Sequence, residues 1–279
     1  MAAAETVGAA LQRARELLQG RDSSRLDAEV LLAAVTGLGR EVFYSRPERP
    51  LAPEHLADFN RLVQRRHEGY PVAYLTGHRE FWSLEFKVSR DTLIPRPETE
   101  RLVETALEFI AAEADLDVLD LGTGSGAVAV ALAVERARCR ITASDVSPEA
   151  LALARENAEQ ARVGQIRFLE ADWFTGLPLR SFDVIVSNPP YVASAQAGAG
   201  DIRFEPRLAL DGGRSGLAAL QTIIPAARLY LRPGGRLLLE HGHDQGAAVR
   251  RLLQLSHYVD IATRQDHAGL DRVTTGCWP

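Results

Sequence analysis

The tetrapeptide Asn188–Pro189–Pro190–Tyr191 combines side chains and carbonyls that could hold a small polar ligand. It follows residues 182–186, a β-branched run typical of a buried strand. The prolines cannot donate backbone hydrogen bonds, so they end the strand and leave their carbonyls as acceptors. The Asn188 oxygen and a proline carbonyl could accept both hydrogens of a planar NH2 group, with the tyrosine ring on its face. The plainer alternative is a rigid turn with Tyr191 as ordinary packing.

A glycine-rich loop follows another predicted strand and comes directly before a helical pattern; it consists of Gly122, Thr123, Gly124, Ser125 and Gly126. Glycines let the backbone come close to a ligand, and a helix N-terminus supplies amide donors. The spacing G-x-G-x-G departs from the dinucleotide fingerprint G-x-G-x-x-G, which disfavours NAD. A simple turn into a helix remains an alternative for this loop.

Three further side chains at strand ends fit an adenosine group. Asp145 ends the next strand, about 20 residues on, where an acidic residue can accept from two ribose hydroxyls. Asp172 and Trp173 end the strand after that, and a carboxylate with an indole suits an adenine ring. Each residue alone could be a helix cap or a core residue. Together with a site for an NH2 group, they favour S-adenosylmethionine over NAD.

The elements that must position these residues alternate between strand and helix, as in a doubly wound parallel α/β sheet. Apolar runs predict strands at 118–121, 140–144, 166–169, 182–186 and 235–240. Helical spacing predicts helices at 127–135, from Pro148 onward, at 217–231 and at 245–255. Residues 258–263 and 272–275 could form a closing antiparallel pair. Because parallel strands end at one edge of the sheet, the motifs that follow them would gather there.

The segment before about residue 69 follows a helical pattern, with helices expected from Thr6, Ser24 and Pro53. Residues 1–80 hold 11 arginines against 11 acidic residues, which indicates a solvated helical bundle and not a nucleic-acid arm. The pattern over 71–77 and 80–88 predicts a small hairpin or an extended connector.

Arg96 lies between two prolines on a stiffened segment, and Pro97 fits the first turn of a helix expected over residues 98–112. A ligand-facing loop and a capped linker are both compatible with this pattern. The expected domains are 1–77, a helical domain; 78–94, a hairpin linker; and 95–279, the α/β domain.

The composition is that of a soluble globular protein, with 46% hydrophobic and 25% charged residues. A formal net charge of −5 argues against a partner bound through phosphate neutralisation. No run approaches the length of a membrane span, and the N-terminus lacks a secretory pattern, so a cytoplasmic protein without a membrane partner is expected. The two cysteines, Cys139 and Cys277, suggest neither a disulfide framework nor a metal cluster.

Taken together, these motifs resemble the class I S-adenosylmethionine-dependent methyltransferases of amino nitrogens, and more closely the bacterial release factor glutamine methyltransferase family. The resemblance also rests on segments 74–77, 80–82, 93–100, 120–126, 204–206, 209–210 and 239–242. The most discriminating is Pro95–Glu100, because DNA amino-methyltransferases share Asn-Pro-Pro-Tyr but not this segment. Ser215 departs from the family, which usually has Asp there, but it lies outside the inferred chemistry.

The resemblance implies a Rossmann-like, seven-stranded methyltransferase sheet with a small N-terminal helical domain and a connecting β-hairpin. It implies N5-methylation of the glutamine side chain in the Gly-Gly-Gln loop of class I peptide chain release factors. S-adenosylmethionine would be the methyl donor, S-adenosylhomocysteine the product, and no metal would take part. The domain at 1–77 would be an additional grip on the factor, and no direct contact with nucleic acid is expected.

Carried over motif by motif, the resemblance also implies site residues. Cofactor binding would fall to residues at four strand ends: Gly122, Thr123, Gly124, Ser125, Gly126, Asp145, Asp172, Trp173 and Asn188. The glutamine would be held by Asn188, Pro189, Pro190 and Tyr191, with Arg96 and Pro97 lining the approach.

The expected chemistry is an in-line methyl transfer in which the enzyme mainly aligns the reactants. Asn188 Oδ1 and the Pro189 carbonyl would hold the NH2 group and stabilise its developing charge. No side-chain base is assigned, and His241 and His243 are expected in ordinary polar surface roles. The alternatives are a nucleic-acid adenine or cytosine amino-methyltransferase, a nucleotide-binding module without chemistry, and an NAD oxidoreductase.

Overall fold

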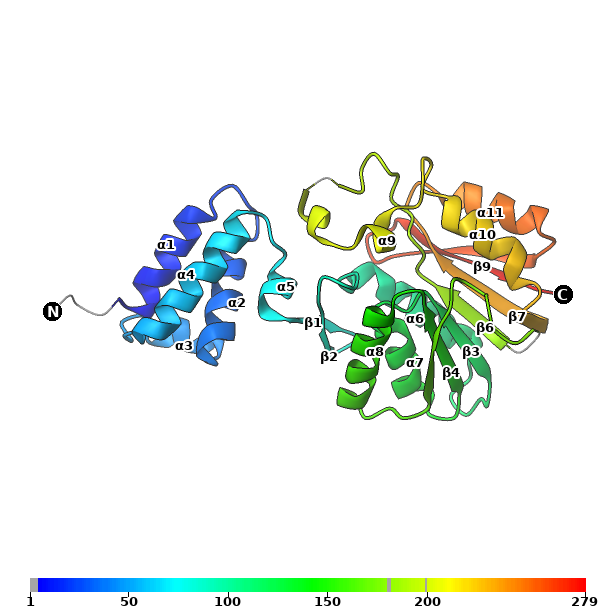
Figure 1. The fold of residues 1–279 in the computed structure, drawn as a ribbon, viewed down its shortest axis with the longest axis horizontal. Helices are drawn as coiled ribbons and strands as arrows, with labels where there is room; N and C mark the ends of the chain where they lie inside the picture. The colour runs from blue at the N-terminus through cyan, green and yellow to red at the C-terminus, as the bar shows by residue number, and fades with distance from the viewer. Residues whose placement is uncertain (1–4, 180–181, 199) are drawn as a thin grey trace. The chain divides into compact units, whose positions relative to one another are not determined.

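The computed structural model describes residues 5–179, 182–198 and 200–279 of the chain. These residues form two compact units. The first comprises the described part of Met1–Gly77 together with Gly200–Phe204, and the second comprises the described residues of His78–Ala199 and Glu205–Pro279. Figure 1 labels the elements of both units along the chain.

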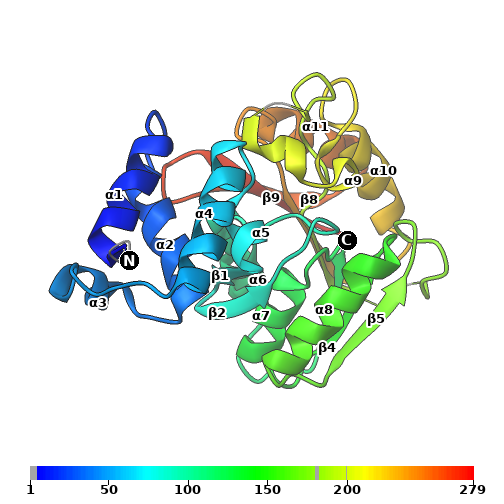
Figure 2. The same cartoon turned by 60° about the vertical axis from the view of Figure 1, so that its left-hand side comes forward.

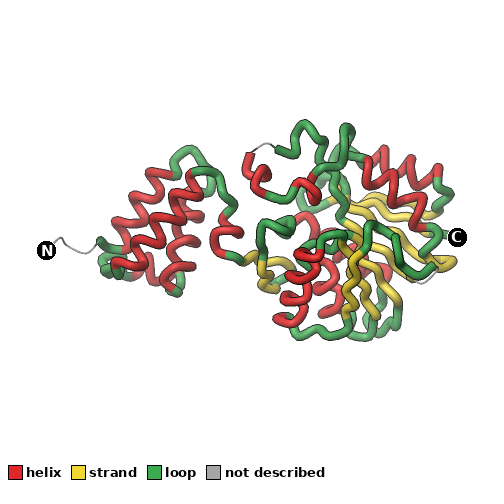
Figure 3. Tube along the Cα trace, viewed as in Figure 1, coloured by secondary structure: helices red, strands yellow, loops and turns green. Residues whose placement is uncertain are grey.

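The first unit is helical, as Figure 3 shows by its colouring. Its elements are α1 (Val7–Leu17), α2 (Ser24–Thr36), α3 (Arg40–Ser45), α4 (Pro53–His67), α5 (Val72–Thr76) and η2 (Gly200–Phe204). Phe59 is fully buried among leucines and alanines of α1, α2 and α4, so the apolar faces of these helices make one core. The expected helical bundle is confirmed.

Two short helices of this unit were not expected from the sequence. The six residues of α3 follow Gly39, and α5 occupies residues for which an extended connector was one expectation. Pro71 precedes α5 in an extended conformation, and Gly77 ends it with a positive φ of 80° that glycine adopts without strain. Both helices are too short for apolar periodicity to reveal.

The second unit begins with the expected hairpin, formed by β1 (His78–Phe81) and β2 (Leu84–Lys87). Its two-residue turn, Trp82 and Ser83, has positive φ at both positions, as a type I′ turn requires. The backbone nitrogen of Trp82 donates to Glu100 at 2.9 Å, and its indole nitrogen donates to Glu135 at 2.9 Å. These bonds attach the turn to two helices of the same unit.

The centre of the second unit is a seven-stranded sheet with the order β5-β4-β3-β6-β7-β9-β8. Its strands are β3 (Asp117–Leu121), β4 (Arg140–Asp145), β5 (Ile166–Glu170), β6 (Phe182–Ser187), β7 (Leu231–Glu240), β8 (Val259–Gln265) and β9 (Asp271–Cys277). The first five in this order pair in parallel, whereas β9 runs antiparallel to both β7 and β8. The predicted Rossmann-like sheet of seven strands and its closing antiparallel pair are confirmed.

Helices cover both faces of this sheet, as Figures 1 and 2 show from two directions. The helical elements of the unit are η1 (Pro97–Thr99), α6 (Glu100–Phe109), α7 (Ala127–Glu135), α8 (Pro148–Gln160), α9 (Arg207–Leu210), α10 (Ala218–Ala227) and α11 (Gly246–Leu255). Side chains of α6, α7 and α8 bury one face of the sheet, and those of α10 and α11 bury the other. Alternate residues of β3 divide between the two cores: Val118 joins the first and Leu119 the second.

Two element boundaries differ from the sequence expectation. The helix expected over 98–112 begins as the 3₁₀ turn η1 and ends at Phe109, and β7 begins at Leu231, where the end of a helix was expected. Within the part of the chain that the structure describes, no helix is both long and apolar enough to span a membrane. Cys139 and Cys277 are buried and free.

Candidate active site

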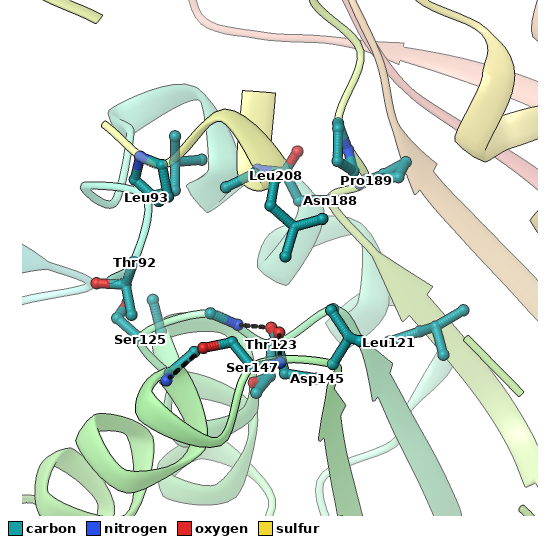
Figure 4. A pocket seen from close by; sticks show the side chains of 18 of the residues that line it. Thr92, Leu93, Leu121, Thr123, Ser125, Asp145, Ser147, Asn188, Pro189 and Leu208 are labelled. Atoms are coloured by element: carbon teal, nitrogen blue, oxygen red, sulfur yellow. Dashed lines mark hydrogen bonds between the residues drawn. The ribbon is translucent and has the colours of Figure 1, made fainter. Parts of the chain in front are cut away.

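A cavity of about 480 Å³ lies where the parallel strands end, and Figure 4 shows side chains from several strand ends pointing toward it. Because β5, β4, β3 and β6 are neighbours in the sheet, the loops that follow them meet at one edge. Eleven sequence-predicted site residues line the cavity: Arg96, Gly122, Thr123, Gly124, Ser125, Asp145, Asp172, Trp173, Asn188, Pro189 and Pro190. Three others, Pro97, Gly126 and Tyr191, lie outside its lining.

Asp145 is locked to the glycine loop by backbone hydrogen bonds. Its Oδ2 accepts from Gly124 N at 2.8 Å, and its Oδ1 accepts from Ser147 N at 3.0 Å. Gly124 has a φ of 56°, which lets its amide face the carboxylate without the strain that a side chain would bring. A carboxylate has about four acceptor positions, so Asp145 keeps acceptors for a ligand at a fixed place beside the loop.

Gly126 has a different role in the same loop. Its φ is 82°, and a Cβ placed on it would lie 3.0 Å from the Cβ of Ala154. The lack of a side chain therefore allows α7 to pack closely on α8, as the third glycine of a nucleotide-binding loop does. Gly126 thus helps to shape the loop from outside the cavity.

Asp120, the last residue but one of β3, supports the loop through hydrogen bonds. It is buried, and its Oδ2 accepts from the Thr123 hydroxyl at 2.6 Å and from Ala129 N at 3.1 Å. Burial raises the pKa of Asp120 to about 6, and these two hydrogen bonds act in the opposite direction. The carboxyl thus ties the loop to the first turn of α7.

Trp173 holds an unusual backbone conformation at the cavity wall. Its φ is 50°, in the left-handed region that bulky residues seldom adopt. Its ring is the nearest neighbour of the space beside Gly122, at 3.8 Å from a Cβ placed there. Strained residues of this kind cluster at functional sites, where the surrounding structure compensates for the strain.

The Asn188 side chain is held by a residue from another element. Its Nδ2 donates to Thr99 Oγ1 at 3.1 Å, and Thr99, at the end of η1, is 4% exposed. With the nitrogen engaged in this way, Oδ1 is the amide atom left to accept a hydrogen bond from a ligand.

Tyr191 is anchored by its hydroxyl group, which donates to Glu240 Oε1 at 3.1 Å. Glu240 ends β7 and is fully buried. Burial raises the pKa of Glu240 to about 7, although the Thr99 and Tyr191 hydroxyls and the Arg272 guanidinium each lower it. Burial and the Glu240 charge also raise the pKa of Tyr191, which stays protonated and acts as a donor.

Arg96 is paired with Glu205, whose other oxygen accepts from the backbone nitrogen of Ile94 at 3.1 Å. Glu205 is 6% exposed, so the pair fixes the stiffened segment that carries Arg96 at the cavity wall.

The expectation that His241 lies at the polar surface is wrong. Its side chain is fully buried because it follows the last residue of β7, an interior strand of the sheet. Its Nε2 shares a hydrogen bond of 2.7 Å with Thr274 Oγ1, and burial lowers its pKa. His241 therefore belongs to the interior of the sheet.

Comparison with known proteins matches both parts of the chain. Residues 9–77 match the family model described as PrmC N-terminal domain, and residues 100–202 match Methyltransferase small domain. The release factor glutamine methyltransferase of Salmonella typhimurium is 49% identical over 268 residues, which cover 95% of this chain and 96% of that protein. The protein of the same name from Shewanella oneidensis is 46% identical over 281 residues, which cover 100% of this chain and 98% of that protein. A methyltransferase crystal structure from Pyrococcus furiosus aligns with a TM-score of 0.54 and 20% identity, over 78% of this chain and 98% of that one.

The order of the sheet, the cavity at its strand ends and the matched domain define an α/β methyltransferase. Its relatives share about half of their residues with it over nearly their whole length. The chain belongs to the release factor glutamine methyltransferase family. The names of these relatives do not favour the alternative function, a nucleic-acid amino-methyltransferase.

Thr99, Glu205 and Glu240 are site residues that sequence reasoning did not assign. Each lies within a segment that carried the family resemblance: residues 93–100, 204–206 and 239–242. Their place in these segments was the one sequence signal that could have found them. None of the three residues stands next to Asn188 or to the glycine loop in the sequence, so the motifs themselves did not point to them. Only the fold brings Thr99 to Asn188 and Glu240 to Tyr191.

Proposed function

We propose that this protein transfers a methyl group from S-adenosylmethionine to the N5 atom of a glutamine side chain. The substrate is the glutamine of the Gly-Gly-Gln loop in class I peptide chain release factors. The proposal is supported by the names of the full-length relatives. The observation that carries it at the level of atoms is one cavity lined by both Asp145 and Asn188, the first suited to a nucleoside and the second to an amide.

The cavity residues fit the proposed cofactor. A volume of about 480 Å³ lies within the usual range for small-molecule sites. One Asp145 oxygen accepts from Gly124 N and the other accepts from Ser147 N. Each oxygen has a second acceptor position, so the carboxylate can also accept from two ribose hydroxyls. Trp173 and Asp172 offer a ring face and an acceptor for adenine, and the loop from Gly122 to Ser125 offers a backbone that a ligand can approach closely.

When bound, S-adenosylmethionine supplies an electrophilic methyl group on a sulfonium and becomes S-adenosylhomocysteine. Asn188 Oδ1 and the Pro189 carbonyl accept the two amide hydrogens and stabilise positive charge on the attacking nitrogen. Pro190 and Tyr191 keep this corner rigid, and Arg96 with Pro97 borders the approach of the substrate. The N–C bond would form as the C–S bond breaks, and the nitrogen would then lose a proton to water or along a path of carbonyl groups.

The two parts of the chain divide this task. Residues 1–77, together with the segment 200–204 of the same unit, grip the release factor, and the hairpin linker spans 78–94. The rest of residues 95–279 binds the cofactor and carries out the transfer. The partner is a protein, with no direct part for nucleic acid or a membrane, and a translation factor as substrate sets the reaction in the cytoplasm.

The test is to incubate the full chain with labelled S-adenosylmethionine and either a class I release factor or total nucleic acid. We expect label on the release factor alone, and a gain of one methyl group on the Gly-Gly-Gln peptide by mass spectrometry. A release factor with alanine in place of that glutamine is the control and should take no label. Label on nucleic acid, or on another residue of the factor, would contradict the proposal.

A further inference from the structure

Two partly buried hydrogen bonds hold Asn188 and Tyr191 beside a carboxyl group that has no place in the transfer described above. Asn188 Nδ2 donates to Thr99 Oγ1 at 3.1 Å, and Tyr191 donates to Glu240 Oε1 at 3.1 Å. The Thr99 hydroxyl faces the same carboxyl and lowers its pKa, although no hydrogen bond of standard geometry joins Thr99 to Glu240. Tyr191 is therefore bonded directly to the end of β7, and Asn188 is bonded to a hydroxyl that faces the same carboxyl.

Glu240 has spare capacity to accept a hydrogen bond. Its second oxygen, Oε2, is buried, and among the described residues it has no hydrogen-bond partner of standard geometry. A buried acceptor without a partner is costly, so the nearby Thr99 hydroxyl gains by directing its proton there. Once that proton is committed to Glu240, Thr99 Oγ1 can only accept from Asn188.

This arrangement decides which way the Asn188 amide faces. An ionised carboxylate accepts hydrogen bonds and never donates, so it sets the direction of every bond in the series. When Thr99 turns its proton toward Glu240, its oxygen accepts from Asn188 Nδ2, and the Asn188 oxygen is left for the substrate. A flipped amide would instead present two donors to the substrate NH2 group, which is itself a donor.

We propose that Glu240 is a positioning residue for the methyl transfer: acting through Thr99 and Tyr191, it orients the Asn188 amide and holds the tetrapeptide in place. The proposal rests on the proposed function, because it assigns to Asn188 the role of accepting from the substrate amide. It also gives the segment Pro95–Glu100 a chemical task, since Thr99 is the member of that segment that contacts Asn188.

The charge state of Glu240 adds a dependence on pH. Arg272 favours the ionised form, whereas burial and Glu98 oppose it; the hydroxyls of Thr99 and Tyr191 also face it. His241, the next residue, has a lowered pKa and stays neutral near pH 7. With the pKa of Glu240 at about 7, a falling pH protonates it, and a carboxylic acid can donate as well as accept. The fixed direction of the bonds is then lost.

The first test replaces the link between Glu240 and Asn188. Thr99→Val keeps the shape of the side chain and removes the hydroxyl, and we expect kcat to fall about 10- to 100-fold, as misplacement of a reacting group does. The dissociation constant for S-adenosylmethionine should change less than about threefold, a shift well under 1.4 kcal/mol. Thr99→Ser restores the hydroxyl and should recover most of kcat. Thr222→Val, at an exposed position on α10, is the matched control.

The second test removes the charge of Glu240. Glu240→Gln retains the shape but adds a donor, so the ratio of wild-type to variant kcat should be largest near pH 8 and shrink toward one near pH 6. A ratio that is constant across this range would overturn the role of the charge. Equal kcat for Thr99→Val and the wild type would overturn the positioning role.

The outcomes also separate this inference from the proposed function. A wild-type protein that leaves the release factor unmethylated contradicts the proposed function. An active wild type with an unaffected Thr99→Val variant contradicts only the inference. If a variant at Thr99 or Glu240 loses cofactor affinity together with kcat, and Thr99→Ser does not recover either, the role is structural and the proposal fails.

Discussion

At the scale of single residues, the cavity separates binding from reaction. Asp145 is fixed by two backbone amides and lies beside the glycine loop, whereas Asn188 is fixed by Thr99 and follows a different strand. Their supports share no side chain, so substitutions at the two positions should affect different kinetic constants. This separation makes the proposed roles testable one at a time.

Asn188→Ala removes the acceptor proposed for the substrate amide. We expect kcat to fall by about 10²- to 10³-fold, the usual effect of removing one preorganised group that stabilises charge in a transition state. Affinity for S-adenosylmethionine, measured by calorimetry, should largely survive. Asn60→Ala in α4 of the first unit is the control. Near-normal turnover of Asn188→Ala would remove Asn188 from the mechanism.

Asp145→Ala removes the acceptor proposed for the ribose hydroxyls. Hydrogen bonds to a charged group contribute about 1.5–3 kcal/mol, so affinity for S-adenosylmethionine should fall about 10- to 100-fold. The turnover number at saturating cofactor should change much less. Asp58→Ala, at an exposed position on α4, controls for the loss of a carboxylate. Unchanged cofactor affinity in Asp145→Ala argues against a ribose role.

At the scale of elements, side chains from three helices of the first unit bind one buried carboxylate. Glu29 of α2 is fully buried and accepts from Arg15 of α1, Arg25 of α2, and Arg40 of α3. Burial alone would raise the pKa of Glu29, but hydrogen bonds from Tyr44, Arg40 and Arg25 lower it to about 2. The short helix α3 is thus held by this carboxylate as well as by Phe43, which is buried in the apolar core of the unit. Its six residues are too few for apolar periodicity to predict a helix.

Glu29→Gln should therefore weaken the packing of α1, α2 and α3. We expect a loss of about 1.5–3 kcal/mol at pH 7, the range for hydrogen bonds to a charged group. Because the native pKa lies below the usual value of 4.5, this contribution is present above about pH 4.5 and is lost as pH falls toward about 2. Amide hydrogen exchange in α2, compared between wild type and variant at pH 7 and at pH 3, measures the effect. A difference that does not shrink at the lower pH contradicts the ionised role of Glu29.

At the scale of the whole molecule, much of the second unit could be predicted because each strand is an apolar run and each motif follows a strand. The neighbouring order of β5, β4, β3 and β6 then brings Asp145, Trp173 and Asn188 to one cavity. The supporting residues could not be predicted in this way. Thr99 and Glu240 act across distances of 89 and 49 residues along the chain, which neither spacing nor composition encodes.

The first unit also includes a segment from far along the chain, which local patterns could not reveal. Asp201 accepts from Arg66 at 2.9 Å and from Arg21 at 3.1 Å, and the ring of Phe204 stacks on Tyr70 with centroids 4.2 Å apart. Arg66 also donates to Asp27 at 2.6 Å in a largely buried pair. The segment 200–204 comes shortly after the tetrapeptide in the sequence, so the proposed gripping unit contains chain that continues from the proposed reaction site.

The grip proposed for the first unit predicts that substrate size matters more for turnover than for cofactor binding. Binding energy from parts of a substrate remote from the reacting atom can lower the barrier at that atom. We therefore expect kcat/KM for a short Gly-Gly-Gln peptide to be at least about 100-fold below that for an intact release factor, a difference of about 2.7 kcal/mol. Both substrates are assayed with the full chain, and affinity for S-adenosylmethionine should be the same with either.

The variant Phe204→Ala adds a contrast within the same assay, because it removes the stacked pair inside the first unit and leaves every residue of the cavity lining in place. If the first unit grips the factor, this variant should lower kcat/KM for the intact factor more than for the peptide, which has no remote surface to be gripped. Equal kcat/KM for peptide and intact factor in the wild type contradicts the grip. If Phe204→Ala lowers kcat/KM equally for peptide and intact factor, the segment 200–204 acts only through the tetrapeptide that precedes it. Recognition of the substrate would then belong to the cavity alone.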